Sequence, residues 1–172
     1  MKNADWKTLP LTASVGPLRL LKHKEINEAL TKLLAEARHH IAVFAPRFEF
    51  PAFEDPAVHE ALVRFVHGHP RTGLLMLVGD DVWFMNRNPR LRELCRRYST
   101  FVKARLWASD EPYAQELYVV ADGVAYLHQP HVDKPDTAFA LGAKGAAHGI
   151  LRRFSEAWER GEAISGLLTV GL

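Results

Sequence analysis

The chain has 172 residues, 48% hydrophobic and 24% charged, and its 22 basic and 20 acidic side chains leave a formal net charge of +2. This length predicts one domain with its own core, and the near-balanced charge excludes a nucleic-acid binder that acts through its whole surface. The single Cys95 excludes an internal disulfide, and no apolar run has the length of a secretory signal or of the ~20 residues that span a bilayer, so we expect a cytoplasmic protein with no membrane span.

The chain opens with a stretch that has no sustained period. Residues 1–19 mix polar side chains with proline and glycine, so we expect an irregular N-terminal arm followed by one domain over residues 20–172. From His23 to Arg38, apolar residues recur every three or four positions, which predicts an amphipathic helix. The run IAVFAP that follows predicts a buried strand.

Two cap signals mark the next helices. Asp55-Pro56 and Asn88-Pro89 each combine an N-cap residue with proline at the first helical position, and apolar stripes follow both. Between them, GLLMLVGD is continuously apolar, which is typical of a strand covered on both faces of a sheet.

The second half of the chain predicts antiparallel structure. VKARLWA alternates as a half-exposed strand, and YAQELYVVADGVAYLHQP predicts a β-hairpin with a two-residue turn at Asp122-Gly123. The glycine-rich segment 141–149 favours a flexible entry to a last helix over about 146–160. Together these elements predict an α/β protein with covered parallel strands and an antiparallel part.

The element order, the hairpin and the FSEAW segment, Phe154 to Trp158, resemble a single bacterial phospholipase D-like domain from about Leu20 to Arg160. The resemblance implies an αβα sandwich in which helices flank a mixed sheet. Members of that family carry His-x-Lys, four residues and then Asp on the first hairpin strand, and they cleave or transfer phosphodiesters. Their His attacks phosphorus, their Lys holds the phosphate oxygens and their Asp supports the site.

The motif itself is lost from this chain. Alignment on the hairpin places Ala114, Glu116 and Ala121 at the His, Lys and Asp positions, and a one-residue shift to Asp122 restores neither His nor Lys. Alanine offers no nucleophile. A carboxylate about 4 Å from a phosphate costs about 1 to 4 kcal/mol at effective dielectric constants of 80 to 20, so we expect this pocket to repel phosphate. No catalytic residue is carried over.

Two histidines near the hairpin are weak candidates for a site, His128 and His131. With a two-residue turn, Leu117 pairs with His128, and His128 then projects away from Glu116, as a satisfied or surface histidine. One cysteine and scattered histidines do not make a zinc site. We expect no metal and no cofactor.

The segment from residue 86 to residue 105 is locally basic, with seven basic residues against Glu93 alone, or +6. Such a segment can follow a phosphate backbone, and an aromatic side chain beside it can stack on a base. The alternative is a solvated helix face with a Glu93–Arg97 pair. The candidate anion-binding residues are Arg87, Arg90, Arg96, Lys103 and Arg105, and the candidate stacking residue is Trp107.

These patterns favour a catalytically inactive phospholipase D-like domain that acts as a binding or interaction module, with an anionic, phosphate-bearing molecule as the candidate ligand. One alternative is an active phosphodiesterase or phosphatidyltransferase that uses other residues. A second is a nucleic-acid binder through residues 86–105. The resemblance also implies a homodimer and a separate N-acetyltransferase partner.

Overall fold

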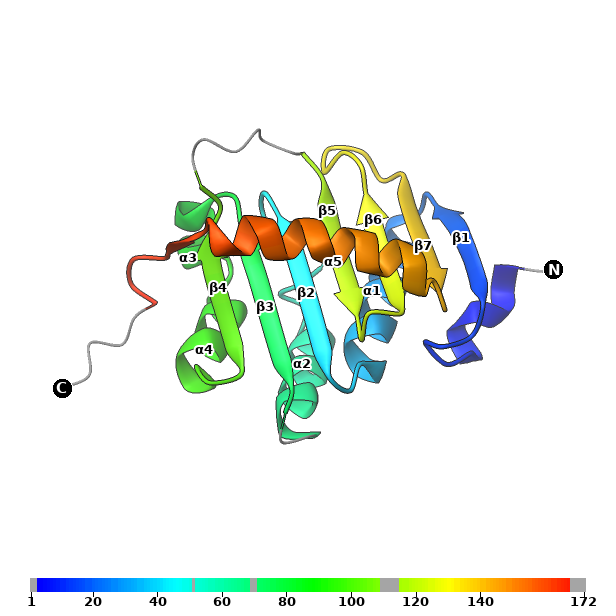
Figure 1. Ribbon diagram of the computed structural model, residues 1–172, viewed down its shortest axis with the longest axis horizontal. Helices are drawn as coiled ribbons and strands as arrows, with labels where there is room; N and C mark the ends of the chain where they lie inside the picture. The colour runs from blue at the N-terminus through cyan, green and yellow to red at the C-terminus, as the bar shows by residue number, and fades with distance from the viewer. Residues whose placement is uncertain (1–2, 51, 69–70, 109–114, 168–172) are drawn as a thin grey trace.

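The computed structural model describes residues 3–50, 52–68, 71–108 and 115–167 (Figure 1). One eight-stranded sheet runs through the molecule in the order β1-β7-β6-β5-β2-β3-β4-β8. The long helix α5 (Lys144–Glu159) crosses one face of this sheet, and α1, α2 and α4 lie on the other face (Figure 1). The expected αβα sandwich with a mixed sheet is confirmed.

Three neighbouring strands in one half of the sheet are parallel. The apolar runs of its inner strands are covered on both faces, as predicted: Ile41 and Val43 of β2 face one core, and Ala42 and Phe44 face another. The parallel strands are β2 (His40–Ala45), β3 (Gly73–Val78) and β4 (Val102–Leu106), and the helices between or before them are α1 (His23–Glu36), α2 (Pro56–Gly68), α3 (Asp81–Arg87) and α4 (Pro89–Arg97).

The other strands pair antiparallel. The hairpin of β5 and β6 joins β2 on one side and β7 on the other, and β1 and β8 are the two edges. Their bounds are β1 (Val15–Leu20), β5 (Leu117–Ala121), β6 (Ala125–Gln129), β7 (Thr137–Leu141) and β8 (Glu162–Ala163).

The expectation of an irregular N-terminal arm is wrong for the described residues. A 3₁₀ helix, η1 (Asn3–Thr8), precedes β1, and β1 pairs with β7 at Leu18 and Phe139. Lys32 of α1 is buried, and its ammonium group donates to the carbonyl oxygen of Leu9 at 2.6 Å. The sequence did not indicate this strand because its partner lies about 120 residues away and its alternation is interrupted by Gly16-Pro17.

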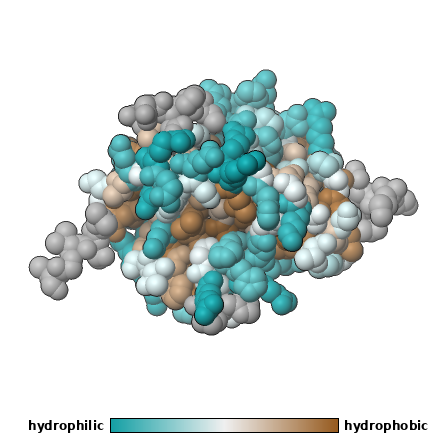
Figure 2. Space-filling model, in the orientation of Figure 1, coloured by the Kyte–Doolittle hydropathy of each residue, from teal (hydrophilic) through white to brown (hydrophobic). Residues whose placement is uncertain are grey.

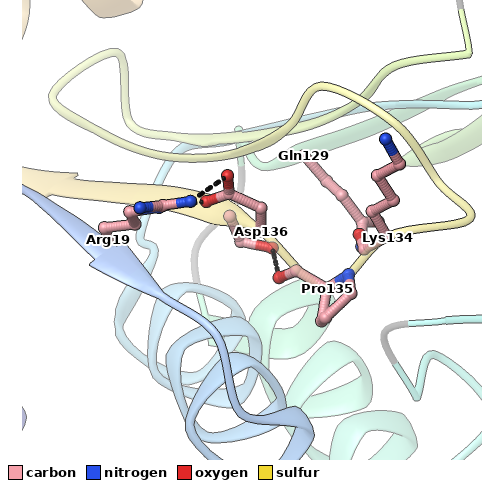
Figure 3. Close-up of polar contacts among 6 residues, drawn as sticks. Arg19, Gln129, Lys134, Pro135 and Asp136 are labelled. Carbon is pink, nitrogen blue, oxygen red and sulfur yellow. Dashed lines mark hydrogen bonds and ion pairs between the residues drawn. The ribbon is translucent and has the colours of Figure 1, made fainter.

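An exposed ion pair lies between β1 and the start of β7 (Figure 3). The guanidinium of Arg19 donates to both carboxylate oxygens of Asp136, at 2.8 and 2.9 Å. Beside it, the side-chain amide of Gln129 donates to the carbonyl oxygen of Lys134 at 2.7 Å, which holds the β6–β7 connection. Because the ion pair is exposed, its contribution to stability is small.

Two helix starts differ from the expectation. Helix α3 was not predicted, and Asp80 caps it by accepting from the backbone amide of Trp83 at 2.9 Å. Asn88 does precede α4, but its side chain donates to the carbonyl oxygen of Phe48 rather than capping the helix. Glu54 accepts from the first amides of α4 instead.

The two faces of the sheet have unequal cores. The larger core lies between the sheet and helices α1, α2 and α4, and it includes the fully buried Leu30, Leu33, Phe84 and Phe139. Two smaller clusters lie under α5, around Phe44 and Tyr126. One helix covers less of a sheet than several do, and a pocket lined by strand residues remains on this face.

Candidate functional site

The hairpin has a three-residue turn, so its expected register is wrong by one residue. Ala121 pairs with Ala125 across Asp122, Gly123 and Val124, and His128 therefore pairs with Tyr118 rather than with Leu117. A one-residue change of register moves every side chain of a strand to the other face. His128 consequently lies on the same face as Glu116, not away from it.

A pocket of about 560 Å³ lies on this face, between the hairpin, strands β2 and β3, and α5. Glu116 and Tyr118 line it from the hairpin, and Arg153 lines it from α5. In the same orientation as Figure 1, Figure 2 shows apolar surface at the middle of the α5 face between hydrophilic side chains. The apolar lining consists of Ala42, Phe44, Leu77, Trp107, Val120, Pro130, Ile150, Phe154 and Ala157.

Four polar side chains meet at the edge of this pocket. The hydroxyl of Tyr118 donates to Oε2 of Glu116 at 2.8 Å, and Nη1 of Arg153 donates to the same hydroxyl at 3.1 Å. Nη2 of Arg153 lies 3.4 Å from Oε2 of Glu116. The ring of His128 stacks on the ring of Tyr118, with centroids 4.2 Å apart and planes 7° apart. The negative charge of Glu116 is therefore offset by a cation in direct contact.

The environment shifts the pKa values of three of these groups. Burial, the hydrogen bond to Glu116 and the charge of Glu116 raise the pKa of Tyr118 to about 12. Burial, partly opposed by Glu116, lowers the pKa of His128 below its ordinary value of 6.5. Tyr118 and Glu116 raise the pKa of Arg153. At neutral pH the cluster thus holds a neutral histidine, a neutral tyrosine and one carboxylate–guanidinium pair.

His128 has no open path to an incoming phosphorus atom through Nε2. That nitrogen is buried, has no hydrogen-bond partner within the described residues, and lies 3.9 Å from Oε1 of Glu116. A nucleophile must reach the reacting atom, so this arrangement does not favour His128 as a replacement for the missing nucleophile.

The other two motif positions, Ala114 and Ala121, are not among the described residues that line the pocket. Ala114 lies outside the described residues. Ala121 is fully buried in the larger core, on the opposite side of the sheet from the pocket. Its neighbour Asp122 accepts from three backbone amides, those of Arg38, His39 and His40, at 2.8 to 3.0 Å. Asp122 therefore ties the hairpin turn to the segment that enters β2.

The family described as "Domain of unknown function (DUF7931)" matches residues 22–169. The chain belongs to this family. No curated protein matches the sequence.

Solved structures share the fold of this DUF7931 domain at low sequence identity. NucT from Helicobacter pylori superposes with a TM-score of 0.59 at 9% identity, over 85% of this chain and 98% of that one. Phosphatidylserine synthase from Haemophilus influenzae Rd KW20 gives 0.56 at 15% identity, over 83% of this chain and 38% of that one. These neighbours support the expected phospholipase D-like fold.

A third structure is TrmBL2, described as an archaeal chromatin protein with a novel mode of DNA binding. It has a TM-score of 0.62 and 11% identity, over 86% of this chain and 54% of that one. The DUF7931 chain thus spans about half the length of TrmBL2.

The sheet divides the basic segment into two groups. Arg87, Arg90 and Arg96 belong to α3 and α4, whose buried side chains are in the larger core. Lys103 and Arg105 alternate with the β4 residues that face that core, so they lie on the α5 side. The predicted residues therefore do not form one continuous surface.

Most of the predicted anion-binding side chains have internal partners. Arg90 donates to the carbonyl oxygen of Glu54, and Arg96 donates to that of Gly166. Arg105 donates to the carbonyl oxygen of Trp158 at 2.7 Å, and its guanidinium lies 4.6 Å from the centroid of the Trp158 ring. These contacts hold the helices and α5 in place and compete with any ligand.

Two of the predicted candidates, Trp107 and His131, line the pocket. Trp107 packs edge-on against Phe44, with ring centroids 3.9 Å apart, and His131 is exposed at the pocket edge. Sequence reasoning missed Tyr118 and Arg153. Tyr118 was detectable, because it follows Glu116 by two residues in a strand. Arg153 was not, because its position depends on how α5 crosses the sheet.

Within the described ranges, no group of three or more His, Cys, Asp and Glu side chains is placed to hold a metal ion. No described helix is both long and apolar enough to cross a membrane.

Proposed function

We propose that this chain is a phospholipase D-like binding module that holds a ligand in the pocket beside Glu116 and does not cleave phosphodiesters. The observation that carries the proposal is the engagement of Glu116: its carboxylate accepts from Tyr118 and contacts Arg153. The position where the resembled family holds a phosphate with lysine is occupied here by an anion, and the nearest cation is already paired with it.

The pocket favours binding over chemistry for two further reasons. Its lining combines apolar side chains with a few polar groups, which is typical of a recognition site. The buried Nε2 of His128 and the neutral hydroxyl of Tyr118 offer no accessible nucleophile at neutral pH.

The test is an assay of purified protein with bis-p-nitrophenyl phosphate, labelled DNA and a phospholipid, each with and without a chelator. We expect no turnover above buffer for any substrate. Turnover that is abolished in Glu116→Ala or His128→Gln would overturn the proposal and favour an active phosphodiesterase or phosphatidyltransferase.

Nucleic-acid binding is a second candidate, favoured by the fold shared with the DNA-binding TrmBL2 and by the local +6 of residues 86–105. Because the sheet separates the basic groups, the pair Lys103→Ala/Arg105→Ala and the pair Arg90→Ala/Arg96→Ala test different faces. Binding through either face must weaken steeply with salt. The slope of the logarithm of the binding constant against the logarithm of the salt concentration should decrease in magnitude by roughly one for each phosphate-binding cation that a substitution removes. Binding that is absent or independent of salt removes this candidate.

Two expectations about partners stay predictions. A homodimer predicts twice the chain mass in light scattering. A separate N-acetyltransferase partner predicts its co-purification with tagged protein.

A further inference from the structure

The pocket has the size and lining of a small-molecule site. Its volume of about 560 Å³ falls within the roughly 300 to 1,000 Å³ of such sites. The apolar part of the lining includes the aromatic side chains of Phe44, Trp107 and Phe154 beside aliphatic ones. Such a surface recognises the apolar body of a ligand by burial and ring packing.

The charges around the pocket balance one another. Glu116 and Glu156 are its acidic lining residues, and Arg153 and Arg160 are its arginines. Arg153 contacts both Tyr118 and Glu116, and Arg160 also takes part in an interaction within the chain. An anionic ligand would have to compete with Glu116 for Arg153, whereas an uncharged ligand leaves that pair intact.

We infer that the pocket binds a small, uncharged amphipathic molecule. Its aromatic or aliphatic body lies against Phe44, Trp107 and Phe154, and a neutral hydrogen-bonding group lies at the Glu116–Arg153 pair. The inference rests on the proposed function, because it names the ligand class of the same pocket. It departs from the anionic ligand expected from the sequence.

Two fluorescent probes of similar shape separate the ligand classes. N-phenyl-1-naphthylamine is uncharged, and 8-anilinonaphthalene-1-sulfonate has the same fused rings with one added negative charge. We expect saturable binding of the neutral probe to the folded chain, at least about tenfold tighter than binding of the sulfonate. Glu116→Ala should narrow this difference by strengthening sulfonate binding.

A pair of helix variants places the probe in the pocket. Ala157→Leu fills space in the pocket, since Ala157 lines it, whereas Ala146→Leu adds the same atoms at an exposed position of the same helix. We expect the first variant to weaken binding of the neutral probe about tenfold or more and the second to leave it unchanged. Melting temperatures verify that both variants fold.

If Ala157→Leu does not fold, energy transfer from tryptophan to the bound probe shows instead whether the probe lies in the pocket. Trp107 lines the pocket, so Trp107→Phe should reduce the sensitised emission of the bound neutral probe while its binding persists.

The results decide separately on the ligand class and on the proposed function. No saturable binding of the neutral probe, sulfonate binding as tight as neutral binding, or equal affinities of the Ala157→Leu and Ala146→Leu variants would overturn the ligand class. Turnover of bis-p-nitrophenyl phosphate is a separate measurement and would overturn the proposed function instead.

Discussion

The face of the sheet under α1, α2 and α4 is filled by apolar side chains, whereas the face under α5 keeps an open pocket with a polar cluster at its edge. A single strand, β5, serves both faces. Leu117, Val119 and Ala121 enter the larger core, and Tyr118 and Val120 face α5. Alternation along one strand thus separates the residues that stabilise the domain from those available to a ligand.

This difference between the two faces predicts what each kind of variant should change. Substitutions in the closed face should lower stability and leave the pocket chemistry intact. Substitutions around the pocket should change which molecules bind and have smaller effects on stability.

The largest expected effect is on the closed face. Leu33 of α1 is fully buried there, so Leu33→Ala should lower the free energy of unfolding by about 2 to 5 kcal/mol. Leu75 of β3 is partly buried on the α5 side, and Leu75→Ala should cost about half as much or less. Urea denaturation measures both, and equal losses would contradict the contrast between the faces.

The hairpin turn comes next. Asp122→Ala removes the acceptor for three backbone amides at a residue with φ of 53°, so it should cost about 2 kcal/mol. Asp122→Asn retains one oxygen and tolerates this backbone conformation, so it should cost less. Thermal unfolding of the two variants and the parent chain measures these losses. Equal stability of Asp122→Ala and the parent chain would show that the hydrogen bonds between the turn and the segment before β2 do not stabilise the fold.

A smaller effect is expected in the pocket. Glu116→Ala removes a carboxylate in contact with Arg153, so inorganic phosphate should bind more tightly by about 1 kcal/mol, or about fivefold. Titration calorimetry on the parent chain and the variant measures the change. Glu93→Ala on α4 is the control, outside this pocket, and should leave phosphate binding unchanged.

The smallest effect concerns pH. Because burial lowers the pKa of His128, the unfolded chain takes up a proton below about pH 6.5 that the folded chain resists. Folded-state stability should therefore fall as pH drops from 7 to 5, and His128→Gln should reduce this fall. Urea midpoints at the two pH values test it, with exposed His148→Gln as the control. An unchanged pH dependence in His128→Gln would exclude the buried histidine as its source.

Local patterns in the sequence were sufficient for the main elements. Continuous apolar runs identified β2 and β3, and Asp55-Pro56 identified the start of α2, where the Asp55 carboxylate accepts from the amide of Ala57. The alternation of β4 was also visible. These features depend on neighbouring residues only.

What the sequence did not reveal depends on distant residues or on one-residue differences. Strand β1 forms because β7 is there to pair with it. The side of the sheet that His128 occupies was predicted wrongly because the turn contains Val124 as a third residue. Arg153 reaches Glu116 only because α5 crosses the hairpin.

The most direct measurement of the central claim is a crystal structure of the parent chain soaked with dimethyl phosphate. We expect the Glu116–Arg153 contact to be intact and no dimethyl phosphate to be bound against it. A dimethyl phosphate ion bound by Arg153, with Glu116 displaced or protonated beside it, would show that the pocket accepts a phosphate.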